Sequence, residues 1–242
     1  MLRGIYNAAY AMEIAARNHE IVSENLVHAT TPGYRRQGLL YEATAPSVPP
    51  PSGGDLVPAP TATQPPRSYL YLEPGPLQQT NNPLDVAVSG DAFFVVQGPN
   101  GPLYTRNGSF ELGPGGDLRT RGGGYAVSGQ GGAIAVPPDA ANITIGTDGT
   151  VTANGNSVGR LQLARFDSPN SLRRAGPTLF EGDAPQEPPP LSVRVEQGFR
   201  EGSNVQAVQE MVSMMLGMRQ YEAAGKIMQS ISDAVSQNTR PK

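Results

Sequence analysis

The sequence predicts an α+β chain in which one helix at each end flanks a central all-β domain of short antiparallel strands. Apolar residues recur at spacings of three and four near both termini, as on one face of a helix. The middle alternates between strand-like runs and turns, in a chain with 29 Gly and 24 Pro. We expect the two helices to pair as a coiled-coil-like terminal domain. The expected divisions are residues 1–36 for the N-terminal helix, 37–66 for a Pro/Gly-rich connector, 67–198 for the β domain and 199–242 for the C-terminal helix.

The N-terminal helix is expected over residues 2 to 26. Its apolar positions are Leu2, Ile5, Ala9, Met12, Ala16, His19, Val22 and Leu26. The helix should end before Pro32 and Gly33, because proline disfavours helical backbone in the residue before it and glycine permits a turn. The charged residues Glu13 and Arg17 continue the same helical pattern, which argues against a cleaved signal peptide.

The connector contains a low-complexity stretch from residue 45 to residue 66, with proline clusters at both ends. This composition disfavours a helix or a central strand and favours an extended, polyproline-like or irregular segment. Two interpretations stay open, a loose linker and a segment that docks on a partner.

Strand signals extend from Ser68 to Val195. Asp148-Gly149 and Asn154-Gly155 lie between alternating runs, and such dipeptides are the strongest short-range signal for a hairpin. The glycine clusters at 122–124 and 129–132 lack the Lys-Ser/Thr of a phosphate-binding loop and are interpreted as turns. The middle of the chain is therefore predicted to be a compact set of short strands.

The C-terminal helix is expected from about Ser203 to Val235. Ser203 and Gln206 have the spacing of a capping box, and Asn204 is a second candidate cap. The apolar positions that follow are Val208, Met211, Met215, Met218, Tyr221, Ala224, Met228, Ile231 and Val235. Methionines are adaptable, so they suit either a seam that fits several partners or an ordinary intramolecular core.

The two helices alone offer little apolar surface relative to the conformational entropy lost on ordering them. We therefore expect both ends of the chain to become fully ordered only against neighbouring subunits.

Composition excludes several functional classes. The net charge of −3 and the pI near 5.4 argue against nucleic-acid binding through phosphate contacts. The chain has no Cys, so it has no disulfide, thiolate metal site or cysteine nucleophile. No segment approaches the ~20 apolar residues that span a bilayer, so we expect no direct membrane insertion.

An enzyme is the main rival class. The histidines are His19 and His28, both in or beside the first helix, and no Gly-x-Ser-x-Gly is present. Paired carboxylates for glycoside chemistry stay open, although Asp85 and Asp148 lie where aspartate commonly supports turns. We predict no enzyme activity, no catalytic, cofactor-binding or metal-binding residues, and no cofactor.

Three motifs resemble the flagellar rod and hook family, and the resemblance covers nearly the whole chain. The motifs are Met1–Tyr6 with Ser23–Tyr34, then Asn82–Val95 with Tyr104–Phe110, and finally Glu201–Val205 with Glu210–Val212 and Arg219–Glu222. The chain departs from the usual Asn and Ala of the first motif at Glu24, Val27, His28 and Thr30. Asn25 remains, as does Thr31-Pro32-Gly33.

The resemblance implies a structural subunit of the bacterial flagellar basal-body rod, which polymerises through its terminal helices and forms part of the drive shaft for motility. Its partners would be copies of itself, other axial proteins and the flagellar type III export apparatus. Its location would be the exported, periplasm-spanning rod of the basal body. Chain length and residues 201–205 favour a proximal-rod type. The alternatives are a distal rod or hook-type axial subunit, or a secreted β-rich adhesin or binding module.

The motifs also have physical interpretations. Thr31-Pro32-Gly33 should end the helix and redirect the chain, and Asn107-Gly108 should form a tight turn with positive φ. The residues expected to make assembly contacts are Leu2, Ile5, Ala9, Met12, Ala16, Leu26, Asn25, Thr31, Pro32, Gly33, Tyr34, Asn204, Val205, Val208, Met211, Met215, Met218, Tyr221, Met228 and Ile231.

Overall fold

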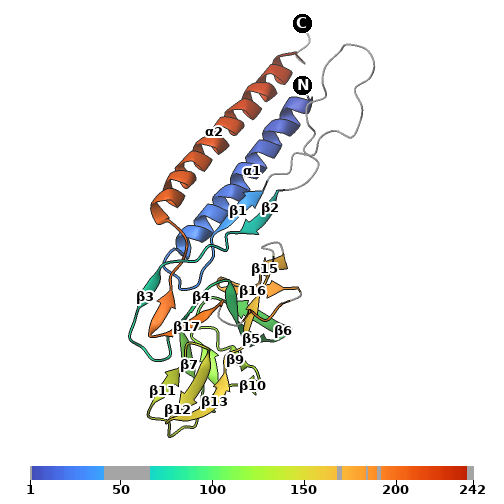
Figure 1. The fold of residues 1–242 in the computed structure, drawn as a ribbon. Coiled ribbons are helices and arrows are strands. Elements are labelled where there is room, and N and C mark those ends of the chain that lie inside the picture. Colours follow the sequence, from blue (N-terminus) through green and yellow to red (C-terminus); the bar gives the residue numbers. More distant parts are fainter. Residues whose placement is uncertain (1, 41–65, 168–170, 184, 190–191, 239–242) are drawn as a thin grey trace. The chain divides into compact units, whose positions relative to one another are not determined.

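The computed structural model describes residues 2–40, 66–167, 171–183, 185–189 and 192–238 (Figure 1). Its helices are α1 (Leu2–Val27) and α2 (Ala207–Asn238). Its strands are β1 (Gln37–Leu40), β2 (Arg67–Leu70), β3 (Leu77–Gln79), β4 (Val86–Ser89), β5 (Ala92–Gly98), β6 (Gly101–Thr105), β7 (Phe110–Leu112), β8 (Leu118–Thr120), β9 (Ala126–Gly129), β10 (Gly132–Ala133), β11 (Ile143–Ile145), β12 (Thr150–Ala153), β13 (Asn156–Arg160), β14 (Leu163–Arg165), β15 (Leu172–Arg174), β16 (Leu179–Gly182), β17 (Arg194–Gln197) and β18 (Phe199–Glu201). Most of the predicted connector, residues 41–65, lies outside the described residues.

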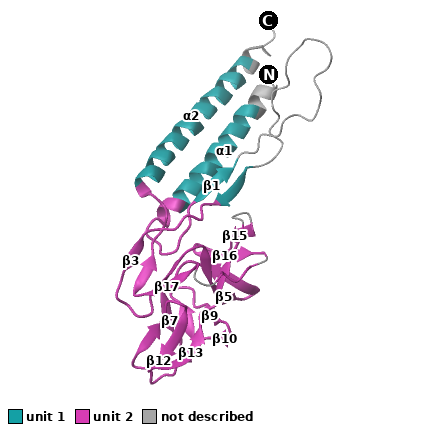
Figure 2. Ribbon diagram, in the orientation of Figure 1, with its two compact units in different colours: residues 1–24, 37–69, 208–242 teal, residues 25–36, 70–207 magenta. Residues whose placement is uncertain are grey.

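The chain forms two compact units, each built from separate stretches of sequence (Figure 2). Unit 1 contains residues 1–24, 37–69 and 208–242, and unit 2 contains residues 25–36 and 70–207. Unit 1 therefore holds most of both helices together with the two-stranded sheet β1-β2. Unit 2 holds the other strands.

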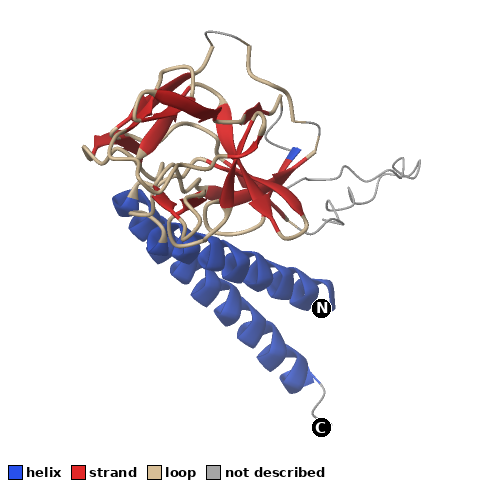
Figure 3. Cartoon of the chain, turned by 90° about the horizontal axis from the view of Figure 1, so that it is seen from below, coloured by secondary structure: helices blue, strands red, loops and turns tan. Residues whose placement is uncertain are grey.

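In unit 1, α1 and α2 touch through small side chains. A cavity of about 330 Å³ lies between them, lined by Ala15, Ala16 and His19 of α1 and by Gly217 and Met218 of α2, among others. A Cβ placed on Gly217 would lie 3.8 Å from Nδ2 of Asn18 in α1. The two helices diverge towards the chain termini (Figure 3). The contact is therefore local.

The predicted coiled-coil-like pairing is wrong. The stripe that α2 buries consists of Glu210, Gly217 and Ala224, which recur every two helical turns. Met211, Met215 and Met218 of the expected seam lie on another face and are exposed, with Met215 56% exposed. Large side chains that interlock between two helices define a coiled coil, and the described residues show no such layer. The structure instead has two helices in local contact and a large central β region.

Unit 2 is organised around a nine-stranded sheet. Its order is β15-β16-β6-β5-β9-β8-β7, with β10 also paired to β9 and β14 to β5. Strand β5 alternates between two hydrophobic clusters, so that Phe94 and Val96 enter one and Phe93 and Val95 enter the other. Both faces of this strand are therefore buried.

Smaller sheets complete unit 2, namely β11-β12-β13, β17-β4 and β18-β3. The hairpin predicted at Asn154-Gly155 is confirmed, because β12 pairs with β13 and the two turn residues have φ of 50° and 84°. Asp148-Gly149 likewise joins the paired strands β11 and β12.

Candidate functional site

The turn that follows α1 brings all three sequence motifs into contact. Gly33 has φ of 70°, and its N–H donates to the carbonyl of Glu201 at 2.8 Å. A Cβ at this position would lie 2.3 Å from the backbone nitrogen of Asn107. Only glycine combines this left-handed backbone with so close an approach. The turn therefore fixes residues from three distant parts of the sequence next to one another.

A buried carboxylate between two buried arginines forms the centre of this contact. Nη2 of Arg35 donates to Oε1 of Glu201 at 2.6 Å, and Nη1 of Arg106 lies 3.4 Å from Oε2. The backbone N–H of Gly75 also donates to Oε1, at 2.8 Å. Arg35, Arg106 and Glu201 are each at most 2% exposed. We call Gly33, Tyr34, Arg35, Arg106, Glu201 and Asn204 the motif cluster.

Arg106 makes further contacts that hold its guanidinium in place. Nη1 donates to the carbonyl of Val88 at 3.2 Å, and Nη2 donates to that of Gly90 at 2.6 Å. The guanidinium carbon lies 4.8 Å from the ring centre of Phe93. Arg106 thereby ties the chain after β6 to both ends of the β4–β5 turn.

The cluster buries two cations with one anion. Burial and, to a smaller extent, the charge of Arg35 lower the pKa of Arg106 to about 10, although Glu201 and Asp91 act in the opposite direction. Among the described residues, Nε and Nη1 of Arg35 and Nε of Arg106 have no hydrogen-bond partner. A pKa near 10 still leaves Arg106 charged at neutral pH, so Glu201 is the group that offsets two buried charges.

Tyr34 packs on the end of α1. Its hydroxyl donates to Oδ1 of Asn25 at 3.2 Å, and its ring stacks on His28 with centroids 4.9 Å apart. The guanidinium carbon of Arg174 lies 4.4 Å from the centre of the same ring. His28 departs from the usual family residue, and here it supplies a stacking partner within unit 2.

Asn204 connects three backbone segments. Oδ1 accepts from the N–H of Arg36 at 2.7 Å, and Nδ2 donates to the carbonyls of Tyr71 and Glu73, each at 3.0 Å. The prediction that it caps the last helix is wrong, because α2 begins only at Ala207 and the side chain is engaged elsewhere. Asn204 instead fastens the chain that precedes α2 to the chain that follows α1.

The predicted positive φ at Asn107-Gly108 is also wrong, because neither residue is among those with positive φ. Oδ1 of Asn107 accepts from the N–H of Ser109 at 3.1 Å, which forms an Asx turn. Gly108 is required for a close approach, since a Cβ there would lie 1.7 Å from the carbonyl oxygen of Val86.

The structure places the predicted assembly residues in three groups. The side chains of Leu2 and Ile5 lie outside the described ones. The buried and half-buried residues are Met12, Asn25, Leu26, Thr31, Pro32, Gly33, Tyr34, Asn204, Val205, Met228 and Ile231. The exposed residues are Ala9, Ala16, Val208, Met211, Met215, Met218 and Tyr221.

The central charged residues of the motif cluster were not among the predicted site residues. Arg106 and Glu201 belong to the quoted motifs, but nothing local assigns them a role, and Arg35 lies just beyond the first motif. Arg35 and Glu201 are 166 residues apart in sequence. The sequence signal that could have identified Arg106 and Glu201 is their charge, because they lie inside motifs whose other residues mainly favour turns.

Two family models match separate parts of the chain. The model described as the flagellar hook protein FlgE/F/G D1 domain matches residues 87–153. The model described as the flagellar basal body rod FlgEFG protein C-terminal matches residues 196–236, which include Glu201 and Asn204.

Similar curated proteins extend the match to almost the full length. The flagellar basal-body rod protein FlgF of Salmonella typhimurium is 34% identical over 249 residues, covering 96% of this chain and 95% of that protein. FlgF of Escherichia coli is 33% identical, with 96% and 95% covered. FlgG of Buchnera aphidicola subsp. Schizaphis graminum is 30% identical, with 93% and 94% covered.

The chain belongs to the flagellar basal-body rod protein family. The resemblance predicted from the three motifs is thus confirmed, including its preference for the proximal-rod type. This rod protein is a structural subunit of the flagellar basal body and not an enzyme. Membership of the family also indicates assembly with other axial flagellar proteins.

The described part of this rod protein also bears on two other site types. No group of three or more His, Asp or Glu side chains there is placed to hold a metal ion. Neither helix, over its described residues, has the length and apolar character needed to cross a bilayer.

Proposed function

We propose that this rod protein joins its neighbours chiefly through the exposed apolar face of α2. Val208 is 75% exposed, and Met211, Met215 and Met218 are each more than half exposed. Val212, Leu216, Tyr221 and Ile227 extend this apolar surface. A continuous surface of this kind marks an interaction site, because a monomer gains nothing from leaving it in water. This exposure is the observation that carries the proposal.

The chemistry of the face suits a polymer with several kinds of neighbour. Methionine side chains are unbranched and adapt to partner surfaces of different shape. Burying the remaining exposed part of each of these side chains would contribute ~1 kcal/mol. Several such contacts repeated on every subunit are enough to hold a filament whose individual contacts are weak.

We extend the proposal to the rest of the two terminal segments. Residues 1–36 and 199–242 would act together as the assembly domain, with 37–66 as connector and 67–198 as the β domain. Ala9 and Ala16 of α1 are exposed and small, so a neighbouring helix could approach closely there. The motif cluster supports joint action of the two terminal segments, because it holds the segment after α1 beside the segment before α2.

The partners in this proposal are other copies of the chain and other axial proteins of the rod. Export through the flagellar type III apparatus would bring the subunit to a rod that spans the periplasm. The support is the full-length match to relatives that are named as basal-body rod proteins. The matches to FlgF in three organisms support a proximal-rod position.

A triple substitution tests the proposal. Met211→Ser, Met215→Ser and Met218→Ser together should abolish incorporation into basal bodies, because they remove the centre of the apolar face. The matched control replaces exposed residues of α2 that lie off the methionine stripe, by Gln209→Ser, Gln220→Ser and Ala223→Ser. Both variants are expressed in cells that lack the wild-type gene, and basal bodies are isolated and blotted for the chain.

Normal incorporation of the methionine variant would overturn the proposal. Loss of incorporation by both variants would show an effect of altered helix stability. This result would also count against the proposal that the apolar face of α2 makes the contact with neighbouring subunits. Circular dichroism of the two purified variants should give equal helix content.

A further inference from the structure

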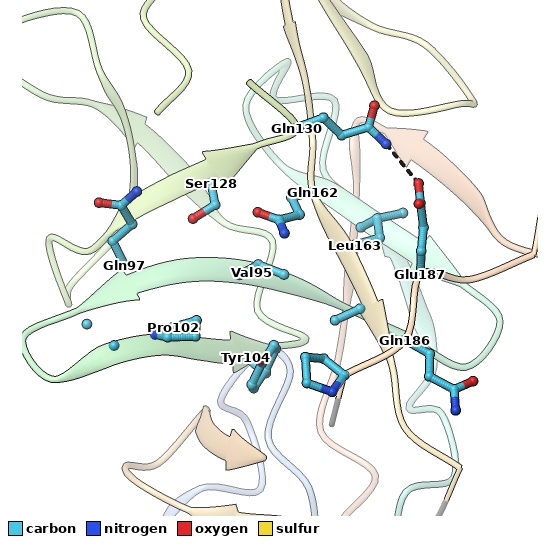
Figure 4. Close-up of a pocket in the computed structure, with 14 residues that line it drawn as sticks. Val95, Gln97, Pro102, Tyr104, Ser128, Gln130, Gln162, Leu163, Gln186 and Glu187 are labelled. Carbon is cyan, nitrogen blue, oxygen red and sulfur yellow. Dashed lines mark hydrogen bonds between the residues drawn. The ribbon is translucent and has the colours of Figure 1, made fainter. Parts of the chain in front are cut away.

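A polar groove crosses one face of the main sheet in unit 2 (Figure 4). It has a volume of about 810 Å³ and is lined by β5, β6, β9, the start of β14 and residues 185–187. This size falls in the range of small-molecule sites. The motif cluster uses none of its lining residues.

Several polar side chains face the groove and have no hydrogen-bond partner in the described part of the chain. Gln97, Ser128 and Gln162 lie along it from β5, β9 and the chain before β14 (Figure 4). The side chains of these three, and the hydroxyl of Tyr104, make no hydrogen bond among the described residues. Each amide carries two N–H donors and a carbonyl acceptor, and each hydroxyl can donate and accept. The groove therefore offers an unused set of uncharged donors and acceptors.

The remaining polar residues of the groove are already engaged and form its wall. Nε2 of Gln130 donates to Oε1 of Glu187 at 3.0 Å, and Nε2 of Gln186 donates to Oδ2 of Asp167 at 2.6 Å. Glu187 is the one charged residue of the described lining. The described lining contains no arginine or lysine, so it does not complement a phosphate, a sulfate or a carboxylate. Burial raises the pKa of Tyr104, which keeps its hydroxyl neutral at physiological pH.

The backbone beneath the groove is not available for pairing. Strand β5 is hydrogen-bonded to β6 on one side and to β14 and β9 on the other. An extended peptide therefore cannot add a strand to β5, which is the usual way in which a sheet recruits a peptide. The ring of Tyr104 is 2% exposed, so the groove also lacks the aromatic platform on which proline-rich peptides dock.

We propose that this groove binds a neutral oligosaccharide whose units carry hydroxyl and acetamido groups. The free amides of Gln97 and Gln162 match hydroxyl and acetamido groups, which likewise both donate and accept. Leu163, which is half-buried, supplies apolar surface for the acetamido methyl group. The site does not depend on the proposed assembly through α2.

Isothermal titration calorimetry on the purified full-length chain tests the proposal with chitotriose as the probe. We expect saturable binding. Gln97→Ala with Gln162→Ala should weaken it ~10-fold, because each substitution removes hydrogen bonds of modest net strength. Gln209→Ala, an exposed glutamine of α2, is the matched control and should bind as the wild type does. Maltotriose, which lacks acetamido groups, should bind at least ~3-fold more weakly.

Three results would overturn the proposal. The first is no binding of chitotriose by a folded wild-type chain. The second is binding that the double variant leaves unchanged, since this would place the sugar elsewhere. The third is equal binding of maltotriose, which would remove the acetamido specificity. A synthetic peptide of residues 45–66 provides a further comparison, and its binding in the groove in place of the sugar would identify a peptide site.

Discussion

Glu201 accepts hydrogen bonds from the side chain of Arg35 and from the backbone of Gly75, and it also pairs with Arg106. Because all three side chains are buried, the carboxylate is what makes burial of the two guanidinium groups tolerable. One residue thus joins the segment after α1, the turn after β6 and the segment before α2. Glu201 contributes to the stability of the fold as the shared partner of both arginines. Removing its charge would leave the two buried guanidinium groups without this partner at the same time.

Replacing Glu201 by glutamine should destabilise unit 2 by about 3 kcal/mol, because a neutral amide leaves both arginines without a counter-charge. The measurement is the free energy of unfolding in urea. Glu111→Gln is the control, since Glu111 is an exposed strand residue, and it should change this free energy by less than about 0.5 kcal/mol. Equal effects of the two substitutions would show that the buried charge pairs do not matter.

Gly33 provides a second test at the scale of single residues. Gly33→Ala must accept positive φ and also a Cβ 2.3 Å from the Asn107 nitrogen. Gly124 has φ of 66° and no atom within 4 Å of the position of a Cβ, so Gly124→Ala meets the backbone strain alone. We expect a loss of ~1 kcal/mol at Gly124 and of at least ~3 kcal/mol at Gly33. Thermal unfolding of both variants measures the difference, and equal losses would argue against tight packing between the motifs.

At the scale of elements, periodicity predicted both helices but not the environment of their faces. Apolar spacing identifies residues that share a face, and Met211, Met215 and Met218 do share one. It does not identify what covers that face. In α2 the buried stripe is Glu210, Gly217 and Ala224, and of these the apolar spacing selected Ala224 but not Glu210 or Gly217. The coiled-coil prediction was wrong for this reason.

The strands illustrate the same limit. Local turn chemistry was sufficient to predict the hairpin at Asn154-Gly155, because the signal and the structure involve the same few residues. The pairs Arg35–Glu201 and Arg106–Glu201 depend on segments that approach only in the folded chain. The motifs marked the segments correctly, but the sequence contained no rule for which charges would meet.

The β11–β12 turn should be sensitive to acid. Hydrogen bonds from Thr150 hold the pKa of Asp148 below its ordinary value of 3.8. A lowered carboxyl pKa means that the stabilisation is present above the unfolded pKa and is lost as pH falls through the folded one. Asp148→Asn should therefore reduce the fall in melting temperature between pH 5 and pH 2. An identical fall in melting temperature in the variant and the wild type would show that this turn does not contribute to the acid sensitivity of the fold.

At the scale of the whole molecule, the two units differ in how much apolar surface they bury. Unit 2 contains two hydrophobic clusters that include Phe94, Phe110 and Phe180. In α2, Ala224 is the one hydrophobic residue among the described side chains that is buried. Local stability follows buried contacts, so α2 is expected to open more readily than the β strands. This difference fits the proposal that α2 gains its main contacts on assembly.

Limited proteolysis of the free chain should reflect this difference. Brief digestion should first remove parts of residues 208–238 and leave a resistant fragment close to residues 67–198. Mass spectrometry of the fragments over time gives the order of cleavage. Early cleavage inside the nine-stranded sheet, with α2 intact, would contradict the assignment of stability to unit 2.

The most direct test of the central claim is whether assembly covers the methionine face of α2. The chain has no Cys, so Met215→Cys introduces a single reactive thiol. Maleimide labelling of the free chain and of isolated basal bodies is compared, with Gly131→Cys in an exposed turn of unit 2 as the control. The account predicts that the thiol at position 215 reacts in the free chain and is protected in the basal body, while the thiol at position 131 reacts in both. Equal labelling at position 215 in the two states would contradict it.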